Sequence, residues 1–480
     1  MRNRRAVVVA GVAIGLFLLL VFVDGRRFGN IDNEDTPALV VGARRSLACL
    51  GDGVLSRCAL VTDDYSDVGP YPLLQYLPAA ALVGLGLDDT DAVQALALLN
   101  YLALLGCLGC ALVLGRRALK GWAPALLVVV LSGPLLFYST AGFGEMLATS
   151  VAVLALTAVL VRRPVAAAAL LALACLGKET MAPFLFVMAV VCGRDDGDRW
   201  WPRRDMLIAI CSAVAGGIAA TMAFNVLRFG TVVNAFYIEP GFRVRTLGRQ
   251  ADFFGALWAA PNGGLLWFWT AATGLLVAAA VLAVRRFATA PGNLASWLPL
   301  TCVLGVFLAY QVAVARWAYP FGWIAWGPRL TIPVVVPLCI AVAHAGGEPL
   351  RAAVARVVRP LPGALAVAFV VAVASLPQSG AVWNYGRATA ALLAADGTCP
   401  SLPTIPDPGH GRFFACESHV MWRRTPSFLW GPVPSTRAVA RVAQVSLMVG
   451  LAALVFAGRP VTAGAAPGAT VRRCRAVAPR

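Results

Sequence analysis

The chain has 480 residues, of which 59% are hydrophobic and 13% are charged, and its formal net charge is +17. Soluble domains carry roughly 25% charged residues, so this composition excludes an ordinary soluble globule. Continuous apolar runs of about 16–23 residues indicate membrane-spanning helices, because barrel strands would alternate instead. Arg and Lys gather in short segments between these runs, as they do in cytoplasmic loops, so the positive charge does not indicate nucleic-acid binding.

The first apolar run, at residues 6–23, follows a basic N-terminus and precedes no small-residue cleavage site. We therefore expect an uncleaved first span with a cytoplasmic N-terminus and a first outer loop at residues 24–91. Residues 68–89 are apolar but contain three prolines, and a crossing there would leave the basic segment 116–120 outside. A helix lying at the outer interface avoids both difficulties, and the second span is then expected at residues 92–114.

The remaining apolar runs alternate across the membrane and bring the C-terminus back to the cytoplasm. The expected spans are residues 122–139, 146–161, 165–177, 180–192, 206–226, 265–284, 297–314, 330–345, 361–376 and 438–456. Two short spans around Lys178 and Glu179 form a thin hairpin whose charged tip lies near the outer face. The fold class is an all-α polytopic membrane protein with about 12 transmembrane helices plus one interfacial helix. The transmembrane domain covers residues 1–457, with a last outer loop at 377–436, and residues 458–480 form a basic cytoplasmic tail.

Three acids lie close together directly after the first span: Asp32, Glu34 and Asp35. Transfer of a sugar to a hydroxyl needs a base that takes the proton of the acceptor, and a membrane-shielded carboxylate can serve as that base. Solvated acids at a helix start would give the same pattern. Glu145, on a short outer turn, is a second candidate acid, and its alternative role is a helix N-terminal acid favoured by the helix dipole.

Basic side chains on the outer side are candidates for binding a phosphate. Lys178 and Glu179, the latter a further candidate for the second acid, interrupt an apolar sequence. They therefore either face a partner or a cavity or extend to the interface. Arg329 begins a span after a Trp-Gly-Pro tripeptide, where its planar fork suits phosphate oxygens or anchors the helix at the interface. Arg243 and Arg245 lie in a long outer loop, where arginines have little weight in orientation and could serve a ligand.

Four cysteines lie in polar outer loops, and an oxidising compartment would allow them to pair as disulfides. The two candidate pairs are Cys49 with Cys58 and Cys399 with Cys416. No cysteine or histidine spacing predicts a zinc site. A divalent cation beside the outer acids is compatible with the sequence, but no motif requires a metal or another cofactor.

Several short motifs together resemble the GT-C superfamily of polyprenyl-phosphate-sugar-dependent glycosyltransferases. Relatives of this kind include protein mannosyltransferases, aminoarabinose transferases and arabinofuranosyltransferases. The most specific motif is Trp326-Gly327-Pro328-Arg329-Leu330, which is similar to Trp/Phe-Gly-Pro-Arg-Tyr-Leu. The other similar elements are Asp35-Thr36-Pro37 with Ala43 and Ser46-Leu47, Tyr71-Pro72-Leu73, Leu176-Gly177-Lys178-Glu179-Thr180, and Asn225 with Phe229-Gly230.

The resemblance implies a cavity open to the outer leaflet, in which a first-loop Asp is the general base and basic residues hold the donor phosphate. It also implies a single displacement that inverts the anomeric carbon. The chain departs from the family at Thr36, Leu73 and Leu330, where an acid, a proline and a tyrosine are usual. The identity of the base therefore stays open among the three acids of the first outer loop.

We therefore expect a glycosyltransferase of the plasma membrane, with both termini in the cytoplasm and its active site outside. It would move a hexose or pentose from a polyprenyl-phosphate donor to an envelope glycan, glycolipid or protein. A flippase or transporter of envelope precursors, and a non-catalytic envelope assembly protein, are the alternatives. No internal repeat typical of transporters is visible. The high Ala, Val, Arg and Gly content is typical of a GC-rich genome, such as that of an actinobacterium.

Overall fold

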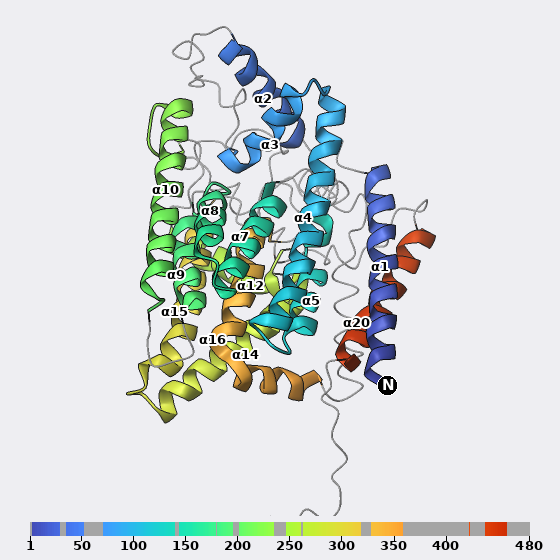
Figure 1. The fold of residues 1–480 in the computed structure, drawn as a ribbon, viewed down its shortest axis with the longest axis vertical. Helices are drawn as coiled ribbons and strands as arrows, with labels where there is room; N and C mark the ends of the chain where they lie inside the picture. The colour runs from blue at the N-terminus through green and yellow to red at the C-terminus, as the bar shows by residue number, and fades with distance from the viewer. Residues whose placement is uncertain are drawn as a thin grey trace, which may run out of the picture.

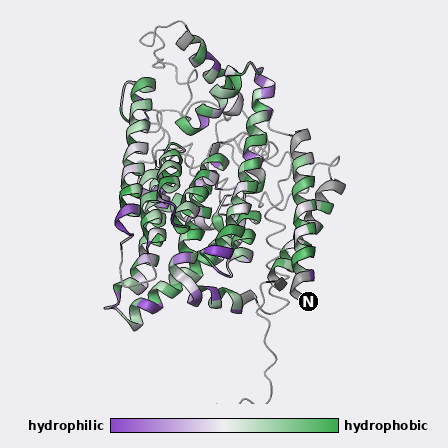
Figure 2. Ribbon diagram, viewed as in Figure 1, coloured by the Kyte–Doolittle hydropathy of each residue, from purple (hydrophilic) through white to green (hydrophobic). Residues whose placement is uncertain are grey.

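The elements that the computed structural model describes are helical. It describes residues 2–28, 35–51, 71–139, 144–178, 180–194, 201–234, 246–260, 263–317, 328–358, 422 and 437–457. Within these ranges, five helices are long and apolar enough to cross a membrane, and several shorter apolar helices accompany them. The helix middles are largely hydrophobic, and hydrophilic residues lie mostly toward the helix ends (Figure 2). This all-helical arrangement fits a multi-pass membrane protein.

The first half of the described chain follows the predicted order of apolar runs. Its helices are α1 (Arg2–Phe28), α2 (Asp35–Gly51), α3 (Leu73–Gly84), α4 (Asp89–Arg117), α5 (Ala123–Leu131), α6 (Leu135–Tyr138), α7 (Gly144–Leu160), α8 (Pro164–Cys175), α9 (Met181–Gly193) and α10 (Arg204–Phe229). Asp88 caps α4 by accepting a 2.8 Å hydrogen bond from the backbone N–H of Asp91. Gly230, with φ of 64°, ends α10 in the left-handed conformation that glycine favours.

The second half contains one helix that the sequence did not predict. Its elements are α12 (Leu247–Ala259), α13 (Leu265–Phe268), α14 (Thr270–Thr289), α15 (Leu294–Val314), the 3-10 turn η2 (Arg329–Thr331), α16 (Ile332–Val358) and α20 (Arg437–Ala457). The unpredicted helix is α12, which packs on α15. The rings of Trp258 and Phe307 meet edge to face there, with their centroids 5.6 Å apart. Helix α16 bends at Gly347, whose φ is 58°. The predicted span at 361–376 lies outside the described residues.

Two predicted spans are broken helices. In place of one helix at 122–139, the chain forms the two helices α5 and α6. The helix is interrupted between them because Gly133 and Pro134 both disfavour helical structure. The span predicted at 265–284 breaks at Trp269, between α13 and α14. The two breaks interlock. The indole N–H of Trp269 donates to the carbonyl of Val129 at 2.7 Å, and a Cβ on Gly133 would lie 2.2 Å from that indole.

The helices nearest the two ends of the described chain, α1 and α20, lie side by side along one flank of the bundle (Figure 1). Small residues allow the approach, since a Cβ on Gly450 would lie 2.7 Å from the side chain of Ile14. The outward face of this pair is apolar, as a lipid-facing surface would be. The exposed residues on it include Val8, Val12 and Val445.

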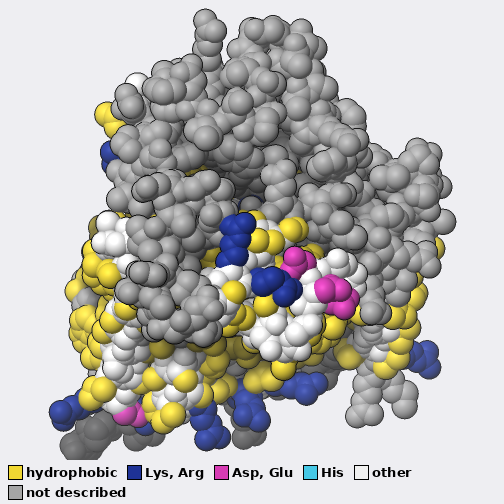
Figure 3. Space-filling model, turned by 90° about the horizontal axis from the view of Figure 1, so that it is seen from above, with side chains coloured by type: hydrophobic (Ala, Val, Ile, Leu, Met, Phe, Trp, Pro, Cys, Tyr) yellow, Lys and Arg dark blue, Asp and Glu magenta, His cyan; other side chains and the backbone are white. Residues whose placement is uncertain are grey.

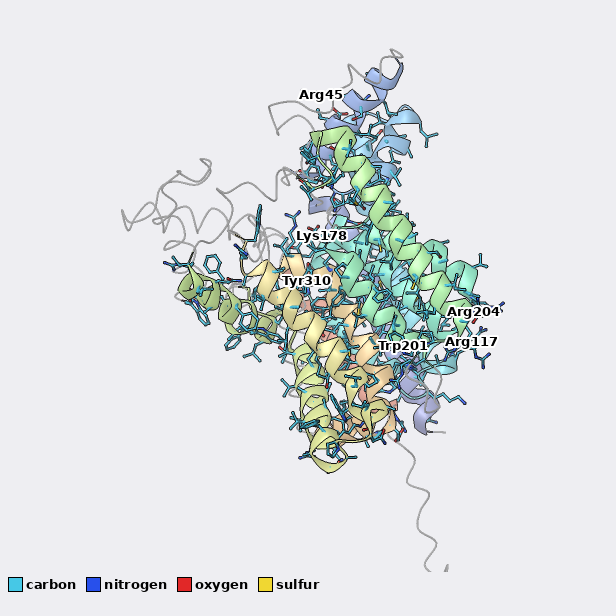
Figure 4. All side chains as sticks on the ribbon, turned by 90° about the vertical axis from the view of Figure 1, so that its left-hand side faces the viewer. Arg45, Arg117, Lys178, Trp201, Arg204 and Tyr310 are labelled. Carbon is cyan, nitrogen blue, oxygen red and sulfur yellow. The ribbon has the colours of Figure 1, made fainter. Side chains whose placement is uncertain are left out.

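Charged segments separate toward opposite ends of the bundle. Helices α2 and α3 lie at one end, which we call the upper end, and the N-terminus lies at the lower end (Figure 1). Figure 4 places Arg45 at the upper end, and Arg117 and Arg204 below the middle of the bundle. The alternating spans predict this separation, since Arg45 belongs to the first outer loop and the other two to predicted cytoplasmic segments.

Candidate active site

Two segments that carry sequence motifs, the start of α3 and the tip between α8 and α9, meet at one junction with the start of α7, which carries the candidate acid Glu145. The backbone N–H of Leu74 donates to the carbonyl of Leu176 at 3.1 Å, which joins α3 to the hairpin tip. A Cβ on Gly177 would lie 2.8 Å from the Cβ of Ala148. A Cβ on Gly144 would lie 1.9 Å from a side chain of α3. The segments therefore approach closely because both positions are glycine.

A buried ion pair joins the start of α16 to the same junction. Nε of Arg329 donates to Oε1 of Glu145 at 2.8 Å, and the two side chains are only 12% and 8% exposed. The hydroxyl of Thr149 donates to the carbonyl of Glu145 at 2.7 Å and lies 3.3 Å from that of Ile332, so α7 and α16 are fixed together. Burying a charge is costly unless it is paired, and each residue supplies the charge that the other needs.

Helix α15 completes the junction through Tyr310. Its hydroxyl donates to the carbonyl of Leu330 at 2.6 Å, and it also forms a hydrogen bond with the side chain of Thr180 at the hairpin tip. The hydroxyl is close enough to the Glu145 carboxylate for the two groups to interact electrostatically. We call this group of residues the Glu145 cluster, and its members are Glu145, Thr149, Thr180, Tyr310 and Arg329.

Helix α2 packs on α3 from above (Figure 1). Buried side chains of α2, among them Val40 and Ala43, pack against α3 around Tyr76. The ring of Tyr76 in turn meets the ring of Phe224 on α10, with the two centroids 5.7 Å apart. The acidic motif enters the structure here, because Asp35 is the first residue of α2. The acidic motif at the start of α2, the Tyr-Pro motif before α3, the hairpin tip and Arg329 are therefore linked through α3 and the Glu145 cluster.

Charged residues of α2 and α4 form an exposed group on the upper end. Arg44 donates to Asp89 at 2.8 Å, and the two side chains are about half exposed. Viewed from above, basic and acidic side chains lie next to one another on the described part of this face (Figure 3). An exposed pair of this kind contributes little to stability.

The structure brings together some of the predicted site residues. Glu145 and Arg329 are in direct contact, and Lys178 lies at the hairpin tip beside Gly177, below α3 (Figure 4). The role of Arg329 as a phosphate ligand stays a prediction. An arginine has five N–H donors, and the contact with Glu145 uses the one at Nε.

Other predicted site residues lie outside the described part. They are Asp32, Glu34, Glu179, Arg243, Arg245, Cys58, Cys399 and Cys416, together with the side chains of Asp35 and Cys49. The choice of base among the first-loop acids and both disulfide pairs therefore stay predictions. Among the described residues, no group of three His, Cys, Asp or Glu side chains could hold a metal ion, and Asp32, Glu34 and the side chain of Asp35 lie outside that part of the chain.

The sequence reasoning missed Thr149, Tyr310 and Gln311. The side chain of Gln311 is fully buried, and both atoms of its amide lack a hydrogen-bond partner in the structure. The available signal was a Tyr-Gln pair inside an otherwise apolar span, since polar groups at membrane depth usually face a partner or a cavity. Thr149 gave no signal, because a threonine in an apolar helix commonly bonds its own backbone.

Comparison with solved structures finds similarity to the ArnT protein of Cupriavidus metallidurans. The apo structure matches with a TM-score of 0.43 and 16% identity, covering 93% of this chain and 77% of that chain. The structure bound to undecaprenyl phosphate matches with a TM-score of 0.40 and 15% identity over the same shares. No protein-family model and no curated protein matches the chain.

Proposed function

We propose that this protein is an integral-membrane glycosyltransferase that moves a sugar from a polyprenyl-phosphate donor to an envelope acceptor. The observation that carries the proposal is the junction at the Glu145 cluster. Segments that resemble separate motifs of such transferases, far apart in sequence, meet there around a buried Arg–Glu ion pair. An ionised pair inside a membrane domain is expensive, so its presence favours a functional site.

The proposed orientation puts the upper end outside the cell. About 12 crossings would place both termini in the cytoplasm, with α3 lying at the outer interface. The separation of Arg45 from Arg117 and Arg204 supports this orientation, because the latter two belong to clusters predicted to lie inside. A donor carried by a lipid would then reach the Glu145 cluster from the outer leaflet.

In the proposed reaction, Asp35 acts as the general base, with Glu34 and Asp32 as the alternatives. The carboxylate takes the proton of an acceptor hydroxyl while the hydroxyl oxygen forms a bond to the anomeric carbon. The bond between that carbon and the phosphate oxygen breaks, and polyprenyl phosphate leaves with the electron pair. Attack opposite the leaving group inverts the anomeric carbon.

The proposed phosphate ligands are Lys178 and Arg329, together with Arg243 and Arg245, which the sequence predicts to lie on the same side of the membrane. Cations stabilise the phosphate both in the bound donor and as it gains charge on leaving. Lys178 has the clearest structural support, because the hairpin tip that carries it is bonded to the start of α3 and packed on α7.

A transfer assay tests the proposal. Purified protein in detergent receives radiolabelled polyprenyl-phosphate sugars (mannose, glucose and arabinose) and a crude envelope acceptor. The same assay is run on Asp35→Asn and on Asp91→Asn, an exposed acid in the first turn of α4 that serves as the matched control. We expect transfer by the wild type and by Asp91→Asn, and its loss in Asp35→Asn. Full transfer by Asp35→Asn and by Glu34→Gln would contradict the role of these acids.

A further inference from the structure

The carboxylate of Glu145 has one oxygen that is satisfied and one that is not. Oε1 accepts the hydrogen bond from Arg329, whereas Oε2 is buried and lacks a hydrogen-bond partner in the structure. Buried polar atoms in folded proteins almost always have a partner, and leaving one unsatisfied is costly. The unpaired oxygen therefore points to a donor group that arrives with a ligand.

The missing donor is better supplied by a neutral hydroxyl than by a metal ion. A carboxylate held by a guanidinium accepts hydrogen bonds only, so its partner must carry an N–H or O–H group or a positive charge. The guanidinium of Arg329 lies 2.8 Å from the same carboxylate, and this charge would repel a second cation. The described residues also give Glu145 no set of His, Cys, Asp or Glu companions that could complete a metal site.

We propose that Oε2 of Glu145 accepts a hydrogen bond from a hydroxyl group of a sugar, and that Arg329 is the residue that positions the carboxylate for this contact. This inference rests on the proposed function, because it takes the ligand to be a sugar of the transfer reaction. The hydroxyl belongs either to the sugar of the donor or to the acceptor. Glu145 thus has a role distinct from that of the first-loop acids: it binds a hydroxyl and takes no proton.

The substitution Glu145→Gln tests the contact without removing the group that faces Arg329. The amide oxygen can still accept the hydrogen bond from Nε, which places the amide NH2 where Oε2 lies in the wild type. The position that accepted a hydroxyl then presents a donor, so the sugar loses a charge-assisted hydrogen bond. Such a bond corresponds to a roughly ten- to hundredfold change in affinity.

The experiment measures the binding of two probes to purified protein in detergent. One probe is polyprenyl phosphate without a sugar, and the other is the polyprenyl-phosphate sugar (mannose, glucose or arabinose) that the wild type binds most tightly. Glu348→Gln is the matched control, because Glu348 also pairs with an arginine but is exposed and lies three residues before it on α16. We expect Glu145→Gln to bind polyprenyl phosphate as the wild type does and to bind the sugar-bearing probe about tenfold or more weakly.

Each outcome decides a separate point. If Glu145→Gln binds both probes normally but shows a raised KM for the acceptor in the transfer assay, the hydroxyl belongs to the acceptor, and the inference still holds. Normal binding of both probes together with a normal acceptor KM would overturn it and leave the proposed function intact. If the wild type binds neither polyprenyl phosphate nor any of the sugar-bearing probes, the proposed function fails, and the inference fails with it.

Discussion

The Glu145 cluster and the lower end of the helical bundle use Arg–Glu pairs in different ways. At the lower end, Arg351 pairs with Glu348 three residues away, and both side chains are well exposed. In the Glu145 cluster, Arg329 pairs with an acid 184 residues earlier in the chain, and both are buried. The first pair needs only one helical turn to form. The second forms only when α7 packs on α16. Burying its two charges is unfavourable, so the pair indicates a role other than that of an ordinary surface ion pair.

Other arginines of the lower end bond to backbone carbonyls at helix ends. Arg162 donates to the carbonyls of Gly193 and Arg194, at the end of α9. Arg286 donates to the carbonyls of Ala345 and Gly346, at the bend of α16. The last carbonyls of a helix lack partners within it, so these arginines satisfy them and connect neighbouring helices. The bonds of these two arginines are thus explained by structure alone, whereas Glu145 in its cluster retains an unsatisfied carboxylate oxygen.

The largest difference in stability is expected between the two arginines of these pairs. Arg329→Gln leaves the Glu145 carboxylate buried without its partner, and we expect a loss of about 3–5 kcal/mol in the free energy of unfolding. Arg351→Gln removes an exposed pair and should cost less than about 1 kcal/mol. Denaturant titration of both variants in detergent measures the difference. Equal losses would show that burial does not distinguish the two pairs.

Close packing around two glycines gives the next largest difference. A Cβ on Gly177 would lie 2.8 Å from Ala148 and 3.1 Å from the carbonyl of Ala174, so Gly177→Ala must move backbone. We expect it to cost about 1–3 kcal/mol. At the lower end, a Cβ on Gly193 would lie 3.0 Å from the side chain of Pro202, and Gly193→Ala should cost less. Thermal unfolding of the two variants tests the order, and a more damaging Gly193→Ala would reverse it.

A smaller effect, of opposite sign, is expected at Gln311. Its buried amide lacks hydrogen-bond partners, so Gln311→Leu removes an unsatisfied group and should raise stability by about 1 kcal/mol. If the amide serves a ligand, the more stable variant will transfer sugar more slowly, as functional groups often trade stability for activity. Unfolding and transfer measured on one preparation test both points. A loss of stability would mean that the amide is satisfied in the folded protein.

The smallest effect is expected at the exposed pair of the upper end. Arg44→Gln should change the free energy of unfolding by less than about 1 kcal/mol, because Arg44 and Asp89 are half exposed and screened by solvent. This variant removes a second exposed pair, at the upper end of the bundle, so it tests whether the small effect expected for Arg351→Gln also holds there. A loss as large as that of Arg329→Gln would show that the upper end is sensitive to any change of charge.

Hydropathy predicts the helices but not their interruptions. Helices α4, α7, α8, α9, α10 and α15 lie where apolar runs predicted spans, because burial and lipid exposure both select apolar residues. The breaks at Gly133 and Trp269 were not predicted, because neither residue alters the hydropathy of its run. Helix α12 was missed because it lies in a long polar loop, where packing on α15 determines its place.

The members of the candidate site could be predicted individually, but their contacts could not. Glu145 and Arg329 were identified by charge beside apolar sequence and by a motif, and each had an ordinary structural alternative. Their pairing depends on the packing of α7 against α16, which no local pattern encodes. Tyr310 and Thr149 joined the group only through contacts to carbonyls of the chain around Arg329.

The most direct test compares sugar transfer by Glu145→Gln and Glu348→Gln. Both variants neutralise one acid of an Arg–Glu pair, one in the Glu145 cluster and one at the lower end. With a radiolabelled polyprenyl-phosphate sugar that the wild type transfers, we predict that Glu348→Gln retains the wild-type rate and that Glu145→Gln loses about tenfold or more. Equal rates for the two variants, both close to that of the wild type, would contradict the assignment of the Glu145 cluster to sugar transfer.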